Sequence, residues 1–167
     1  MSDSNRIQPV LLSISIGPVQ EFIAASRKAR DLWYGSDLLS RLSRAAAKHL
    51  ASAGGVRLIF PAPALIADDS KASVANKILA IVDAGDPADL ARNAKVAATR
   101  ELVNDWEGVK NRYLGNGRGA LINTALVERQ LEEFVEWYAA WIPYDPAAPA
   151  SDADSYHVRR QEVELLL

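Results

Sequence analysis

Gly17-Pro18-Val19-Gln20 forms a turn whose residue types and position could bind a phosphate group. The apolar segment 10–16 ends at Gly17, and a helical pattern of apolar residues starts at Gln20. Backbone amides at the start of a helix carry partial positive charge and suit phosphates. A glycine also lets the backbone approach a ligand closely. A plain start of a helix explains the same residues, so both interpretations stay open on the turn alone.

The run Arg30-Asp31-Leu32-Trp33-Tyr34-Gly35-Ser36 is unusual for the interior of a helix. Gly35 costs about 1 kcal/mol relative to alanine there, so we expect either a ligand or a packed segment close to it. The alternative for the polar residues is a packing notch in which Asp31 pairs with an arginine. Trp33 and Tyr34 could stack on a base, but we favour an interface with another protein surface.

Few residues of the chain suit a metal ion. There are no cysteines and only two histidines, His49 and His157. These histidines lie far apart in the sequence and do not indicate a metal or catalytic site. Asp68-Asp69 lies well beyond the second predicted strand, in a proline-containing loop rather than a tight hairpin. We interpret this pair as two solvent-exposed carboxylates of a loop rather than as metal ligands. Gly115-Asn116-Gly117-Arg118-Gly119 looks like a phosphate loop but follows no strand, which favours a linker.

Basic residues gather on one side of the first long helix, although the net charge of −2 gives no case for nucleic-acid binding over the whole surface. Such a stripe could face RNA or a partner, while most are simply solvated. The stripe consists of Arg27, Arg30, Arg41, Arg44 and Lys48.

The order of elements predicts an α+β fold. Apolar and aromatic runs predict strands at 10–16, 56–60, 77–83 and 134–142. Apolar residues at helical spacing predict one long helix from Gln20 to Gly54-Gly55, a second from the cap Asp86 to about Tyr113, and a short one near 123–132. This order is the ferredoxin-like (split βαβ) arrangement, in which an antiparallel four-stranded sheet carries its helices on one face. Polymerase palms, nucleotide cyclases and RNA-recognition modules share the fold, so it does not decide the function.

The organisation of the chain predicts one main domain. We expect a domain over 1–144, a linker over 145–155, and the start of a truncated helix over 156–167, as in a chain cut from a longer protein. No segment suits a signal peptide or a membrane span, which predicts a cytoplasmic protein.

Two blocks of sequence closely resemble the first palm domain of a known family. They are Ile16-Gly17-Pro18-Val19-Gln20-Glu21-Phe22-Ile23 and Arg30 through Ser40, and the resemblance continues through Leu58–Pro61, Asn76–Val82 and Trp137–Pro143. The family is the large, cyclase-like subunit of type III CRISPR–Cas effector complexes (the Cas-ten family, Cmr-type).

The resemblance implies a nucleotide half-site and a scaffold. In that family two palms face each other and join ATP into cyclic oligoadenylates, with Mg²⁺ or Mn²⁺. The implied partners are the second palm, the other effector subunits and, indirectly, guide and target RNA, with no membrane. The nucleotide-binding residues that it implies are Gly17, Pro18, Val19, Gln20, Arg30, Asp31, Gly35 and Ser36.

The sequence departs from the complete family pattern. It has no adjacent His-Asp pair, no Gly-Gly-Asp-Asp turn and none of the cysteines of the zinc module. Ser13 and Ser15 stand at the end of the first strand, where active cyclase palms carry a carboxylate. We therefore expect the chain alone to hold no cofactor and to be inactive. Two alternatives remain, a free-standing cyclase-like signalling domain and a ferredoxin-like RNA-binding module.

Overall fold

The computed structural model describes residues 8–67, 72–114, 122–146 and 155–167. Its strands are β1 (Val10–Gly17), β2 (Val56–Phe60), β3 (Lys77–Val82) and β4 (Glu136–Pro143). They form one antiparallel sheet in the order β2-β3-β1-β4. The α+β, ferredoxin-like fold predicted from the sequence is thus confirmed.

Strand β1 lies at the centre of the sheet and is buried on both faces. Ser13 pairs with Leu79 of β3 on one side and with Ala140 of β4 on the other. The side chains of β1 alternate between the two faces, and Leu11 and Ile14, which point to opposite faces, are both fully buried. The apolar run of β1 reflects this double burial.

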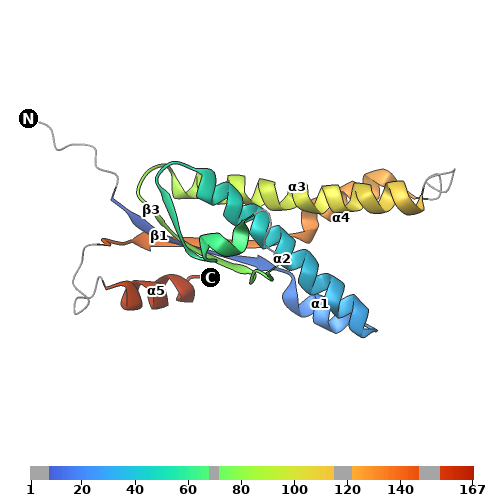
Figure 1. The fold of residues 1–167 in the computed structure, drawn as a ribbon, viewed down its shortest axis with the longest axis horizontal. Helices are drawn as coiled ribbons and strands as arrows, with labels where there is room; N and C mark the ends of the chain where they lie inside the picture. The colour runs from blue at the N-terminus through green and yellow to red at the C-terminus, as the bar shows by residue number, and fades with distance from the viewer. Residues whose placement is uncertain (1–7, 68–71, 115–121, 147–154) are drawn as a thin grey trace, which may run out of the picture.

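The two long helices, α2 (Ala29–Ser52) and α3 (Pro87–Tyr113), cover one face of the sheet, as predicted (Figure 1). Asp86 caps α3 by accepting a hydrogen bond from the Ala88 amide at 2.9 Å, and Pro87 takes the first helical position. The buried residues of these two helices are mostly leucines in α2 and alanines in α3: Leu38, Leu42, Ala46, Ala47, Leu50, Ala91, Ala94, Ala98 and Leu102. Small residues let two helices approach closely.

The single helix predicted from Gln20 onward is wrong, because the chain forms α1 (Val19–Ala25) and then α2. At the junction, Lys28 has an extended backbone, and its amide donates to Asp31 Oδ2 at 3.1 Å. Asp31 therefore starts a new helix by satisfying an amide that a continuous helix would have paired internally. The result is a hairpin of two helices that extends beyond the sheet (Figure 1).

The short helix α4 (Thr124–Phe134) precedes β4. Its cap is Asn123, whose Oδ1 accepts from the Leu126 amide at 3.1 Å. The predicted strand 134–142 is confirmed as a strand, but it starts two residues later because Phe134 still belongs to α4.

The last helix, α5 (Tyr156–Leu165), covers the other face of the sheet (Figure 1). Val163 is fully buried against Leu11, Leu79 and Ile81, and Lys77 Nζ lies 3.3 Å from Glu164 Oε1. The sequence predicted this helix but not its place, so the helices occupy both faces rather than one. Within the described ranges, no helix is both long and apolar enough to cross a membrane.

A charged cluster fastens α2 to α3. Arg41 Nη1 lies 2.8 Å from Asp105 Oδ1, and the Tyr34 hydroxyl donates to Asp105 Oδ2 at 2.5 Å. Burial alone would raise the pKa of Asp105. The hydrogen bonds from Arg41 and Tyr34, with the charge of Arg41, outweigh burial and hold that pKa below its ordinary value. Burial and the neighbouring Asp105 raise the pKa of Tyr34.

We expect Asp105→Asn to lower the free energy of unfolding by about 1 kcal/mol at pH 7, the scale of a partly screened ion pair. A carboxyl with a lowered pKa in the folded state stabilises above its unfolded pKa of about 3.9 and loses this contribution as the pH falls. Urea unfolding should therefore show a difference that shrinks below about pH 4. Glu107→Gln, which removes an exposed pair with Lys110, is the control and should cost at most about 0.5 kcal/mol. An Asp105→Asn effect that does not depend on pH would contradict the charge argument.

Candidate functional site

The turn at Gly17 is held in place by a reciprocal pair of hydrogen bonds. The Ile16 amide donates to the Asn76 carbonyl at 2.9 Å, and Asn76 Nδ2 donates to the Ile16 carbonyl at 2.9 Å. The Gly17–Pro18 peptide bond is cis, and both residues are buried. Asn76 thus fixes the point at which β1 leads into α1.

Gly17 has a neighbour that explains its lack of a side chain. A Cβ atom there would lie 2.4 Å from Glu136 Oε2 and 3.1 Å from Glu136 Cβ, on the adjacent strand β4. The close approach expected at this glycine is therefore made by a side chain of the protein. Gly17 shapes the turn, and no ligand is needed to account for it.

Beside this turn, a pocket of about 310 Å³ lies between α1, α2 and the segment before β3. Three of the predicted nucleotide-binding residues, Val19, Gly35 and Ser36, line it together. The other lining residues are Ile23, Leu32, Leu39, Ser73, Val74, Ala75 and Asn76. The volume is at the small end of the range for ligand sites, about 300–1,000 Å³. Most walls are apolar, with a few polar groups, as such sites usually are.

One wall of the pocket is held by two side chains of α2. Ser40 Oγ accepts a hydrogen bond from the Val74 amide at 2.7 Å. Arg44 donates to the carbonyls of Leu65 (2.8 Å), Ala67 (3.4 Å) and Ala72. Sequence reasoning missed the roles of Ser40 and Asn76 and assigned Arg44 to an outward basic stripe. Nothing in the local pattern could reveal them, because each partner lies at least 21 residues away.

The basic stripe on α2 is divided by the fold. Arg41 and Arg44 point into protein contacts, the first to α3 and the second to the loop after η1 (Pro63–Ile66). Arg27 and Arg30 remain exposed near the start of α2. A continuous basic face for RNA is therefore absent from this helix.

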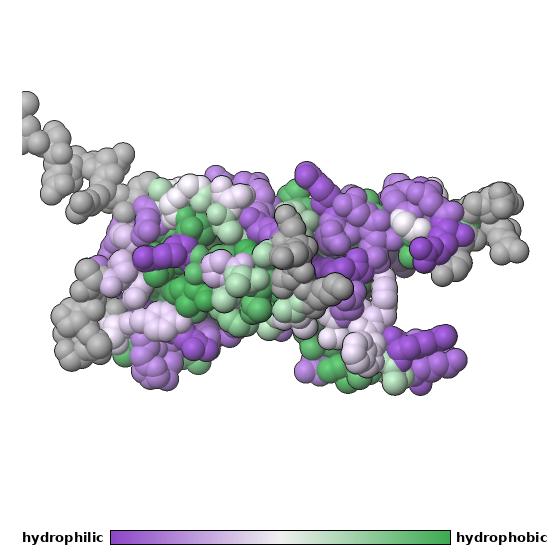
Figure 2. Space-filling model, viewed as in Figure 1, coloured by the Kyte–Doolittle hydropathy of each residue, from purple (hydrophilic) through white to green (hydrophobic). Residues whose placement is uncertain are grey.

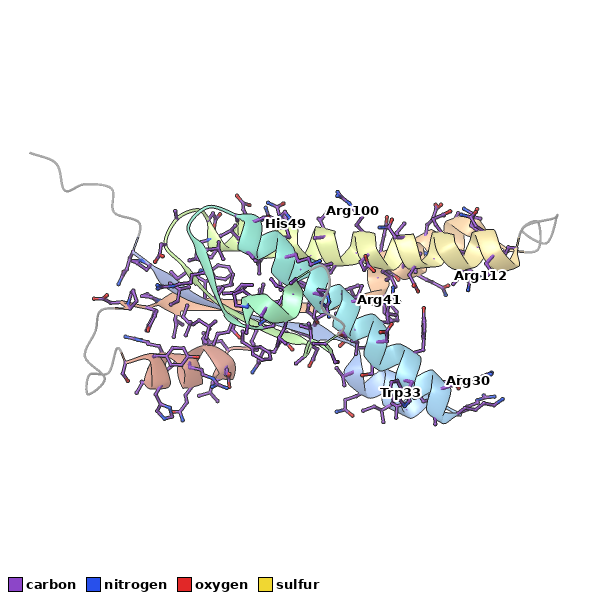
Figure 3. The ribbon with its side chains drawn as sticks, in the orientation of Figure 1. Arg30, Trp33, Arg41, His49, Arg100 and Arg112 are labelled. Atoms are coloured by element: carbon purple, nitrogen blue, oxygen red, sulfur yellow. The ribbon has the colours of Figure 1, made fainter. Side chains whose placement is uncertain are left out.

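The remaining predicted site residues do not join the pocket. Gln20 is exposed beyond it on α1. Arg30 and Asp31 lie at the far end of the helical hairpin, where Arg30 Nε is 3.6 Å from Asp31 Oδ1 (Figure 3). Asp31 lies only one turn before Gly35 on α2, but neither Arg30 nor Asp31 lines the pocket.

The end of β1 does not fit a metal ion. Ser15 pairs with Lys77 on one side and Tyr138 on the other, so a cation already occupies the neighbouring position. In the described ranges there is no group of three or more His, Cys, Asp or Glu residues that could hold a metal. Asp68-Asp69 and the glycine-rich 115–119 segment lie outside the described residues.

The sheet face that RNA-recognition modules use for bases carries α5 in this chain. Leu11, Leu79 and Ile81 of the central strands are buried beneath it. Tyr138, on the edge strand β4, is the exposed aromatic of that face, at 52%. This arrangement offers no row of central aromatics, which argues against the RNA-module alternative.

Comparison with known proteins places the chain in a family. The family model described as CRISPR-associated protein Cmr2, N-terminal, matches residues 11–111, from β1 into the last turns of α3. No curated protein matches the chain. The matched range holds the turn at Gly17, the pocket and the whole helical hairpin, and it leaves out β4 and α5. It covers well over half of the chain and confirms the resemblance noted in the sequence, so the chain belongs to the family of N-terminal regions of the CRISPR-associated protein Cmr2.

Proposed function

We propose that this chain supplies a nucleotide half-site and a scaffold within the large subunit of a type III CRISPR effector complex. The observation that carries the proposal is the pocket that brings Val19, Gly35 and Ser36 together, in a chain that belongs to the Cmr2 N-terminal family. The substrate in this proposal is ATP, and the output of the intact subunit is cyclic oligoadenylate.

The pocket has the chemistry to hold an adenine base. Val19, Leu32 and Leu39 provide apolar walls, and Gly35, which has no side chain, lines the pocket beside them. Ser36 and Asn76 provide polar groups at its border. A base buried among such groups gains from the apolar area and is oriented by a few hydrogen bonds.

The phosphates would lie toward the start of α1. The first amides of a helix have no partner inside the helix and attract anions. Gly17, Pro18 and Gln20 adjoin Val19, which is the residue of this turn that lines the pocket. Arg30 and Asp31 lie too far along the hairpin to belong to this part of the half-site, so six of the eight predicted residues compose it.

The metal ions must come from elsewhere in the subunit. ATP is used as its Mg²⁺ or Mn²⁺ complex, and the described residues of this chain do not fit such an ion. We propose that the facing second palm supplies the carboxylates and that other effector subunits bring guide and target RNA. This division of labour also disfavours a free-standing cyclase.

We expect the purified chain, incubated with ATP and Mg²⁺ or Mn²⁺, to yield neither cyclic nor linear oligoadenylate. The physical reason is that no carboxylate cluster among the described residues could hold the two metals that nucleotidyl transfer requires. Chromatography of the reaction mixture is the measurement, with a complete subunit as the positive control. Metal-dependent product from the chain alone would overturn the half-site proposal in favour of an autonomous cyclase.

Gly35→Leu in the complete subunit should raise the KM for ATP by about tenfold or more, which corresponds to about 1.4 kcal/mol of lost binding. The new side chain occupies the pocket, while leucine is a good helix former. Gly35 is a sharper target than Gly17, whose replacement would disturb Glu136.

Gly108→Leu is the matched control for this experiment. Gly108 also lies inside a long helix, α3, but a Cβ there meets nothing within 4 Å. The control should leave the KM for ATP unchanged and keep or raise the thermal stability. If both variants have the KM of the wild type, the pocket is not the adenine site.

A further inference from the structure

The end of the helical hairpin carries an exposed surface that shares only Ile23 and Leu32 with the lining of the nucleotide half-site. We define the tip patch as Ile23, Arg27, Lys28, Arg30, Leu32, Trp33 and Tyr34. Trp33 is 79% exposed, Ile23 53% and Tyr34 50%. Figure 2 shows apolar surface along this projecting hairpin and hydrophilic surface at its end, and Figure 3 places Arg30 and Trp33 on it.

Three members of the tip patch, Ile23, Leu32 and Trp33, are contiguous. Leu32 lines the 310 Å³ pocket together with Ile23, and it lines an adjacent pocket together with Trp33. Single exposed apolar residues are ordinary on protein surfaces. A contiguous group on a projecting element indicates a surface that another molecule covers.

The charge of the tip patch is positive. Arg27, Lys28 and Arg30 are exposed there, and Asp31 is the acidic residue among them. Asp31 is engaged, because it accepts from the Lys28 amide and pairs with Arg30. The start of α2 adds a partial positive charge of its own. A partner that fits this surface is therefore acidic.

The residue types favour a protein over a nucleic acid. Trp, Tyr and Arg are the residues that most often dominate protein interfaces. The aliphatic side chains of Ile23 and Leu32 adjoin Trp33, whereas a nucleic acid needs cations along its whole path. The cations here stand only at the end of the hairpin, as a rim beside an apolar centre.

We infer that the tip patch docks on another protein subunit of the effector complex, with Trp33 inserted in an apolar slot whose rim is lined by carboxylates. This inference rests on the scaffold part of the proposed function. A symmetric contact between two copies of this chain would place two positive tip patches against each other, and this repulsion disfavours the chain itself as the partner.

Photo-crosslinking in the assembled effector complex tests this inference. Trp33 is replaced by p-benzoylphenylalanine in the full subunit, and Tyr138, exposed on β4, is replaced likewise as the matched position. The expected result is an adduct from position 33 to one protein subunit, at a peptide rich in Asp and Glu, with no such adduct from position 138. An adduct to RNA, an adduct to a second copy of the chain, or no adduct in an assembled complex overturns the inference.

Charge reversal provides a second measurement, which is made with natural side chains on the subunit that the crosslink identifies. Arg30→Glu and Trp33→Ala should each weaken association with the crosslinked subunit at least tenfold, and acid-to-lysine changes in the crosslinked peptide should restore the Arg30→Glu variant. Arg92→Glu, on the exposed start of α3, should have no effect. Equal affinity for all three variants overturns the inference.

The experiments distinguish a failure of the half-site proposal from a failure of the docking inference. Trp33→Ala leaves the lining of the 310 Å³ pocket intact, so it should keep the KM for ATP in complexes assembled at saturating subunit concentration. Gly35→Leu should keep the adduct from position 33. A wrong half-site would thus appear only in the ATP measurements, and a wrong docking surface only in the crosslinks and affinities.

Discussion

The structure depends on the position of β1 at the centre of the sheet. Its backbone pairs with β3 and β4, and its side chains enter the core on both faces. A strand in this position cannot shift by one residue, because every side chain would change faces. Its last residues are therefore fixed in space, and Asn76 fixes them further through Ile16. This fixed strand end holds in place the turn at Gly17, the start of α1 and the pocket beside them.

Helix α2 has two parts with different surroundings. From Leu38 to Leu50 it is buried against the sheet and α3. Before that, it extends beyond the sheet, and Trp33 stays in solvent. Asp105 of α3 binds both parts, because Arg41 belongs to the buried part and Tyr34 to the projecting part. Helix α3 therefore holds α2 on both sides of Leu38.

Local patterns predicted the elements better than their contacts. The apolar run of β1, the Asp86-Pro87 start of α3 and the aromatic run of β4 can each be recognised within a few residues, and all three are confirmed. The break before α2 was missed because apolar residues keep helical spacing across it, and only the cap by Asp31 interrupts the helix. The covering of the second face by α5 was missed because no short pattern says which side of a sheet a later helix will choose.

The candidate site shows the same limit more sharply. Val19, Gly35 and Ser36 were selected from sequence, and they meet because α1 and α2 are antiparallel neighbours. Arg30 and Asp31 were grouped with them by the family resemblance. They lie on the same helix α2 as Gly35 and Ser36, but nearer its start, where the helical hairpin ends, and neither lines the pocket. Ser40, Arg44 and Asn76 shape the pocket through partners distant in sequence.

The placement of both proposed surfaces on one hairpin has a physical consequence. The tip patch lies at the end of the hairpin, the pocket extends from it toward Val19, and Ile23 and Leu32 belong to both. A partner that covers Trp33 would also contact the neighbouring Leu32, one wall of the pocket. In the two proposals, the scaffold and the half-site are therefore two uses of one structural element.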